Sequence, residues 1–162
     1  MTSLPTDITI NFGDGAYKFA LLLPQQIELE DKCGATDAQG VRRRKGIIEI
    51  YADVIAGLLV VDGQIVANPT AGRASAYECR EVVRLALIGG NYGMVEDKEI
   101  TVGPVRALQL VERYIDARPL IERWTLAAAI LRAAVEGFDP PKKAEPGKAP
   151  AKRPPRKTPA SE

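Results

Sequence analysis

Apolar residues recur at helical spacing near the end of the chain. The residues that share this spacing are Leu120, Trp124, Ala127, Leu131, Ala134 and Phe138. Steps of four and three residues keep side chains on one face of an α-helix, so the pattern predicts a helix over 119–138. The other face carries charged residues, so the apolar stripe must pack on a surface. That surface can be the core of this chain, the commoner case, or a partner, and both can hold at once.

A second pattern, with period two, occupies the N-terminal region. Its apolar positions are Ile8, Ile10, Phe12, Tyr17, Phe19 and Leu21. Gly13-Asp14-Gly15 separates the two runs and supplies residues that tolerate positive φ. Alternating runs joined by such a turn predict a β-hairpin over 7–22. Because a lone hairpin is marginal in water, we expect helices to cover its apolar face.

Helical signals recur between these two regions. Pro24 and Pro104 are suited to a first helical turn, and Ser75 with Glu78 forms a capping-box pattern. The predicted helices span 24–33, 46–60, 75–88, 104–116 and 119–138. Residues 35–45, 62–74 and 91–103 are predicted as loops. The expected fold class is α+β and mostly α, with the hairpin packed on a bundle of about five helices in one globular domain over 1–138.

The C-terminal segment differs from this body in composition. Residues 139–162 hold seven of the twelve prolines and seven basic residues against three acidic ones. Such a segment cannot bury enough apolar surface to offset its chain entropy, so we expect a disordered tail. The N-terminus lacks a signal-peptide pattern, and no apolar run reaches 18 residues, so we expect neither secretion nor a membrane span.

The chain offers little of the chemistry that enzymes use. It has no histidine, and its two cysteines, Cys33 and Cys79, have no ligand pattern around them. We therefore expect buried structural thiols, no metal, no cofactor and no catalytic residue.

Clustered positive charge is the one feature that could favour nucleic acid. The candidate electrostatic contacts are Arg42, Arg43, Arg44, Lys45, Lys142, Lys143, Lys152, Arg153, Arg156 and Lys157. The tail has no aromatic residue on which bases could stack, and the body is net acidic. A solvated basic tail is the expected reading, with weak nucleic-acid contact or docking on an acidic protein as alternatives.

Four motifs, in this order, resemble a known family. They are Phe12-Gly13-Asp14-Gly15, Pro24-Gln25-Gln26-Ile27-Glu28-Leu29-Glu30-Asp31-Lys32-Cys33-Gly34, Val83-Arg84-Leu85-Ala86-Leu87-Ile88-Gly89-Gly90 and Val111-Glu112-Arg113-Tyr114-Ile115-Asp116-Ala117-Arg118-Pro119-Leu120. An alanine-rich helix closing at Glu136-Gly137-Phe138 follows them. In outline, residues 8–138 look like the small tail protein of the gene transfer agent family of alphaproteobacterial phage-like particles and prophages.

The resemblance implies a non-enzymatic role in phage-tail morphogenesis. It implies either a tail assembly chaperone, which coats the tape measure protein and helps recruit tail tube subunits, or a structural tube or minor tail component. We favour the chaperone, because amphipathic helices outnumber strands in the predicted elements. That reading implies a homo-oligomer in the bacterial host cytoplasm that is absent from the mature particle. A small nucleic-acid-binding accessory protein acting through the basic tail is the remaining alternative.

Overall fold

A computed structural model of the chain describes residues 3–139. Helices make up 47% and strands 22% of this part, so the fold is α+β and mostly α, as predicted. The α-helices are α1 Leu23–Lys32, α2 Ile47–Ile55, α3 Ala76–Gly90, α4 Pro104–Tyr114 and α5 Leu120–Glu136. The strands are β1 Asp7–Phe12, β2 Gly15–Ala20, β3 Ala35–Thr36, β4 Arg42–Arg43, β5 Leu58–Val61, β6 Gln64–Ala67, β7 Gly93–Val95 and β8 Lys98–Ile100.

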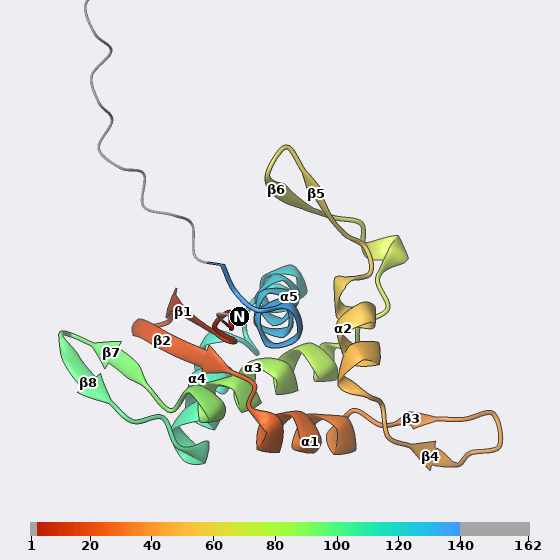
Figure 1. Ribbon diagram of the computed structural model, residues 1–162, viewed down its shortest axis with the longest axis horizontal. Helices are drawn as coiled ribbons and strands as arrows, with labels where there is room; N and C mark the ends of the chain where they lie inside the picture. Colours follow the sequence, from red (N-terminus) through yellow and green to blue (C-terminus); the bar gives the residue numbers. More distant parts are fainter. Residues whose placement is uncertain (1–2, 140–162) are drawn as a thin grey trace, which may run out of the picture.

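The main sheet is antiparallel and has the strand order β1-β2-β7-β8. Its first two strands form the predicted hairpin, in which Ile8 lies opposite Phe19. Helix α3 packs against β2, and α5 packs against both α3 and β1 (Figure 1). The sheet and these two helices enclose the core, and α1, α2 and α4 complete it at the sides.

Aromatic side chains anchor the hairpin to the helices. Phe12 makes edge-to-face contacts with Tyr17, Phe19 and Tyr114, with ring centroids 5.6 to 6.0 Å apart. Tyr17 and Phe19 are fully buried. Buried aromatic pairs of this kind stabilise a core beyond the area that they bury. The apolar face predicted for the hairpin is therefore covered by its own chain except at Ile10, which is half-buried.

Helix α3 can approach β2 closely because of two glycines at its end. A Cβ at Gly89 would collide with the carbonyl oxygen of Ala20, and one at Gly90 with that of Lys18. The sequence predicts that this helix ends at residue 88, but the helix includes both glycines, and Asn91, in the left-handed conformation, caps it. The glycines therefore serve close packing, and the asparagine supplies the helix end.

The predicted start of α3 is confirmed in detail. The Ser75 hydroxyl accepts from the Glu78 backbone N–H at 3.0 Å, and a Glu78 carboxylate oxygen accepts from the Ser75 N–H at 2.9 Å. Both halves of the capping box are present, so two otherwise unpaired backbone donors are satisfied.

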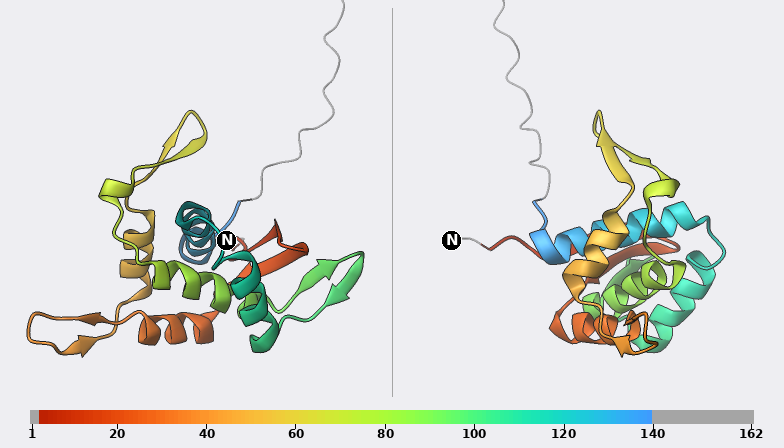
Figure 2. Two further views of the ribbon diagram at one scale, coloured as in Figure 1. Left: turned by 180° about the vertical axis from the view of Figure 1, so that it is seen from behind. Right: turned by 90° about the vertical axis from the view of Figure 1, so that its right-hand side faces the viewer.

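Two segments predicted as irregular contain hairpins instead, and a third contains one strand of a hairpin. Residues 35–45 hold β3–β4, residues 91–103 hold β7–β8, and the predicted loop over 62–74 begins with β6. The helix predicted over 46–60 ends at Ile55, because Gly57 adopts a positive φ of 79° and the chain then enters β5. The apolar run Leu58–Val61 therefore belongs to a strand. Figures 1 and 2 show the three hairpins projecting in different directions.

The other helices agree with their predicted spans within a few residues. The last helix ends at Glu136, because Gly137 adopts a φ of 86°. The prediction that Phe138 lies on this helix was therefore wrong. The tail predicted over 139–162 lies, apart from Asp139, outside the described residues.

Candidate partner-binding groove

The middle of the apolar stripe on α5 is part of the core. Ala127 and Leu131 are completely buried, and Trp124 is 7% exposed. The Trp124 indole N–H donates to the carbonyl oxygen of Val54, which joins α5 to α2. In this conformation these three side chains are packed within the chain, and a partner does not reach them.

The two ends of the predicted stripe are differently placed. Leu120 and Phe138 are 47% and 38% exposed, and Ala134 is half-buried against the core. The structure therefore does not bring the six predicted residues together as one open face. Of the six, only Phe138, which follows α5, lines an open apolar surface.

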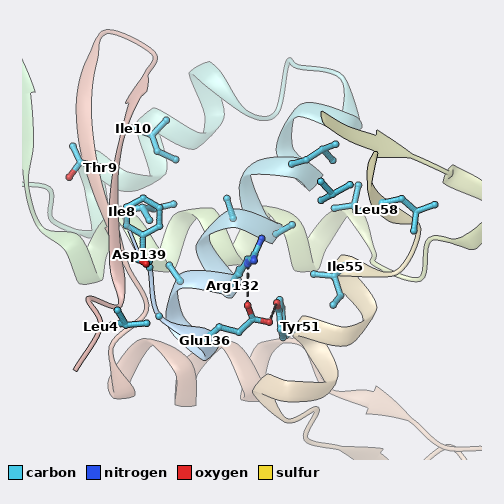
Figure 3. Close-up of a pocket in the computed structure, with 18 residues that line it drawn as sticks. Leu4, Ile8, Thr9, Ile10, Tyr51, Ile55, Leu58, Arg132, Glu136 and Asp139 are labelled. Atoms are coloured by element: carbon cyan, nitrogen blue, oxygen red, sulfur yellow. Dashed lines mark hydrogen bonds and ion pairs between the residues drawn. The ribbon is translucent and has the colours of Figure 1, made fainter. Parts of the chain in front are cut away.

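Such a surface exists on another side of α5. A groove of about 710 Å³ runs between β1, α5, the end of α2 and the β5–β6 hairpin (Figure 3). Its floor is formed by small residues of α5, Ala128, Ala129 and Ala133. Its walls are mainly apolar: Leu4, Ile8 and Ile10 on one side, Ile55, Leu58, Leu59, Val60 and Ile65 on the other.

A second depression of about 440 Å³ continues the groove along α5. It shares Ile10 and Ala129 with the first and is lined further by Ile121, Thr125 and Leu126, with Glu122. Ile121 is 41% exposed, and Ala129 is also exposed. The two depressions together follow much of the length of α5 and form an extended apolar surface.

One end of the groove is polar. Arg132 Nε donates to Glu136 Oε2 at 3.1 Å, and the Tyr51 hydroxyl donates to Glu136 Oε1 at 2.8 Å (Figure 3). Burial and the hydrogen bond to Glu136 raise the pKa of Tyr51 to about 12. Hydrogen bonds from Tyr51 and Arg132 lower the pKa of Glu136. At neutral pH the groove therefore ends in a protonated tyrosine bound to an ionised carboxylate beside a guanidinium.

The basic run at 42–45 is largely neutralised by acidic neighbours. The Arg43 guanidinium makes two hydrogen bonds to Glu49, of 2.9 and 2.8 Å, and Arg44 forms an ion pair with Asp31. Arg42 donates to backbone carbonyls at the end of α1. The structure thus gives each of these three guanidiniums a partner within the chain, which does not favour a nucleic-acid interface here.

Lys45, the last residue of the run, is buried and structural. Its ammonium lies between Glu78 and Asp53, 2.6 Å from an Asp53 carboxylate oxygen. Burial alone would lower the pKa of Lys45, but hydrogen bonds to Asp53 and Glu78 raise it. Lys45 therefore ties the start of α2 to the start of α3 as a charged group. The predicted tail contacts Lys142, Lys143, Lys152, Arg153, Arg156 and Lys157 lie outside the described residues.

Both cysteines occupy the core. Burial raises the pKa of Cys33 to about 12 and that of Cys79 to about 11. A thiol at such a pKa is a poor nucleophile at neutral pH. Within residues 3–139, no group of three or more histidine, cysteine, aspartate or glutamate side chains is placed to hold a metal ion. No helix in the described part is long and apolar enough to cross a membrane.

The sequence reasoning missed the residues on the far wall of the groove. They lie on the β5–β6 hairpin, which we call the arm (residues 58–67). A detectable signal was present, because Asp62-Gly63 separates two short apolar runs and both residues adopt positive φ. Asp-Gly between such runs is a strong hairpin signal. The sequence pattern predicts a loop there instead, because the preceding apolar run Leu58–Val61 continues the helical spacing of α2.

Comparison with known proteins agrees with the resemblance seen in the sequence. Residues 6–137 match the family described as phage tail tube protein, GTA-gp10. Neither the curated proteins nor the solved structures gave a match. The family match covers nearly all of the described residues, including every element that lines the groove. The chain therefore belongs to the GTA-gp10 family of phage tail proteins.

Proposed function

We propose that this tail protein acts during assembly as a chaperone: it holds an amphipathic helical segment of the tape measure protein in the groove on α5 and helps recruit tube subunits. The observation that carries the proposal is the groove itself, an extended apolar channel on the surface of a phage tail protein. We further propose that it has no catalytic activity, self-associates, and works in the host cytoplasm without remaining in the mature particle.

The shape of the groove supports a helical ligand. Helix α5 has 17 residues and is about 25 Å long, so a partner helix of several turns can lie along it. Ala128, Ala129 and Ala133 on the floor permit a short distance between helix axes. Apolar side chains at positions i, i+3, i+4 and i+7 of the partner would contact the floor and both walls.

The groove also has features that distinguish its two ends. Arg132, Glu136 and Tyr51 form the polar end, and Ile121 and Leu126 continue the apolar end. Buried apolar contacts supply most of the binding free energy, and charged groups at the rim favour one orientation of the ligand. A tape measure segment bound here is therefore expected to lie in one direction.

Ala129→Arg tests the proposal directly, because it places a charged side chain where the two depressions meet. We expect wild-type protein to co-purify with, and solubilise, a fragment of the tape measure protein from the same tail gene cluster. Ala129→Arg should reduce the recovered complex by about tenfold. Val105→Arg, on α4 and away from the groove, is the matched surface control. Failure of the wild-type protein to bind any tape measure fragment would refute the proposal.

A structural role in the tail tube is the second candidate. The family description favours it, and the open strands of the arm could join sheets between subunits. Immunodetection in purified particles separates the two roles. A chaperone should be absent from finished particles, whereas a tube subunit should be abundant in them.

A further inference from the structure

The arm, like β3–β4 and unlike the other described strands, is a two-stranded sheet of its own. Strands β5 and β6 pair with each other, from Leu58 opposite Ala67 to Val61 opposite Gln64, and with no other described strand. Figures 1 and 2 show the arm standing away from the body. A two-stranded hairpin alone is only marginally stable in water, so we expect the arm to be stabilised by further packing or strand pairing.

Both faces of the arm are apolar and open to solvent. Cross-strand neighbours share a face, so Val60 and Ile65 lie on one side, and Leu59 and Val66 on the other. These four side chains are 47% to 68% exposed. Neither face of the arm is polar, whereas an isolated strand pair would be expected to turn a polar face to the solvent.

The arm also lacks the charges that protect open strands from pairing. Strands β5 and β6 contain no charged residue. The hairpin β7–β8 carries Lys98 and Glu99 on one strand, and β4 consists of Arg42 and Arg43. Charged side chains on an open strand oppose pairing with another chain. Among the described strand pairs, only β5–β6 has no charged residue in either strand, which favours pairing with a further strand.

The outer edge of β6 is the one that is free to pair. Of the four arm residues that line the groove, three belong to β5 and one to β6, so β5 faces the body. The Asn68 N–H donates to the Gly57 carbonyl at 2.6 Å, and backbone direction alternates along a strand. The backbone groups of Ile65 and Ala67 therefore point outward from β6. Unpaired backbone donors and acceptors in a row are satisfied by another strand, not by a helix.

We infer that β6 pairs antiparallel with β6 of a second copy, so that two arms form one four-stranded sheet centred on Val66. This deepens the self-association included in the proposed function by naming its surface. A second copy is the fitting partner, because it brings an identical uncharged strand with the same outward groups. The groove on the β5 side stays open for another ligand.

Symmetry and local conformation define the register. A two-fold axis between antiparallel strands places one residue opposite its own copy. Asp62 and Gly63 adopt positive φ and cannot extend the strand, whereas Asn68 is extended and Pro69 ends the ladder. The extended segment is thus 64–68, and its centre is Val66. In this register Ile65 lies opposite Ala67 of the second copy. The outward backbone N–H and C=O groups of the two strands then form hydrogen bonds with each other.

Charge at the ends of the arm is compatible with this arrangement. Antiparallel overlap brings Asp62 at the tip of one arm to the base of the other. Arg73 lies at that base, next to Gly72, whose backbone adjoins Gly57. Its side chain is 69% exposed and forms a 3.5 Å ion pair with Asp53. A parallel alignment would instead bring the two Asp62 side chains together, and this repulsion favours the antiparallel arrangement.

Charge reversal at the axis gives the first test. Val66→Lys and Val66→Glu each place two like charges directly opposite one another, so each should weaken self-association by about tenfold or more. An equimolar mixture of the two variants should associate again, as measured by sedimentation over a range of concentrations. Val105→Lys is the control for an exposed apolar residue elsewhere. A monomeric wild-type protein, or variants that associate as well as wild type, would overturn the inference.

Disulfide formation gives the second test, with register as its readout. Val66→Cys places two thiols opposite each other at a distance that a disulfide can span, whereas the thiols of Ile65→Cys lie diagonally and too far apart. Oxidation should therefore link the first variant and not the second. The native thiols are buried and contribute little background. Equal linking of both variants would overturn the register. Two further measurements separate this inference from the proposed function of the groove. The Val66→Lys variant should still bind the tape measure fragment, and the Ala129→Arg variant should still self-associate.

Discussion

The hairpin β1–β2 and the arm are both joined by a short turn with positive φ, but β1–β2 alternates apolar and polar residues and the two hairpins have different surroundings. In β1–β2, Phe19 is buried against the helices, whereas Val60 in the arm is 68% exposed. Helices α3 and α5 cover the first hairpin, and no described helix covers the arm to a similar extent. The comparison shows that one hairpin of this chain is consumed by the core, whereas another leaves its apolar side chains exposed.

Loss of the aromatic contacts of the hairpin β1–β2 should have the largest effect on the stability of the fold. Phe19→Ala removes a fully buried ring that contacts Phe12 edge-to-face. We expect a loss of about 3–5 kcal/mol in the free energy of unfolding, measured by urea denaturation. Thr9→Ala, an exposed position on β1, is the control. A loss of less than about 1 kcal/mol for Phe19→Ala would mean that the hairpin is not part of the core.

A smaller effect is expected where α3 meets the same hairpin. Alanine ordinarily stabilises a helix relative to glycine by about 1 kcal/mol. In Gly90→Ala the new methyl group would collide with the Lys18 carbonyl oxygen, so the sign should reverse. We expect a loss of about 1–3 kcal/mol, visible as a lower Tm in calorimetry. A gain in stability would show that α3 does not approach β2 as closely as the structure indicates.

The smallest effect on folding is expected in the arm. Val60→Ser replaces an exposed apolar side chain that the core does not use. The free energy of unfolding should change by no more than about 0.5 kcal/mol when measured at a concentration where the protein is monomeric. A loss of unfolding free energy comparable to that of Phe19→Ala would contradict the comparison, because it would show that the arm packs on the body of its own chain.

Much of the fold could be predicted from the sequence because it rests on local patterns. Period-two alternation around Gly13 predicted the first hairpin, and the capping box at Ser75 predicted the start of α3. The family was also recognisable, since its motifs occur in order along the chain. Apolar spacing identified α5 as a packing helix, but it could not tell whether Trp124 faces the core or a partner. Both uses require the same spacing.

The remaining features depend on contacts between distant parts of the chain. The apolar run at Leu58 continues the helical pattern of α2, and only the conformation of Gly57 turns it into the arm. Lys45 belongs to a basic run in the sequence, but Asp53 and Glu78 come from two helices to bury it. The groove likewise takes its walls from residues 4–10 and 51–65 and its floor from α5. Local pattern thus determined the five helices and the first hairpin, whereas tertiary packing decided which apolar surfaces are buried within the chain and which stay exposed.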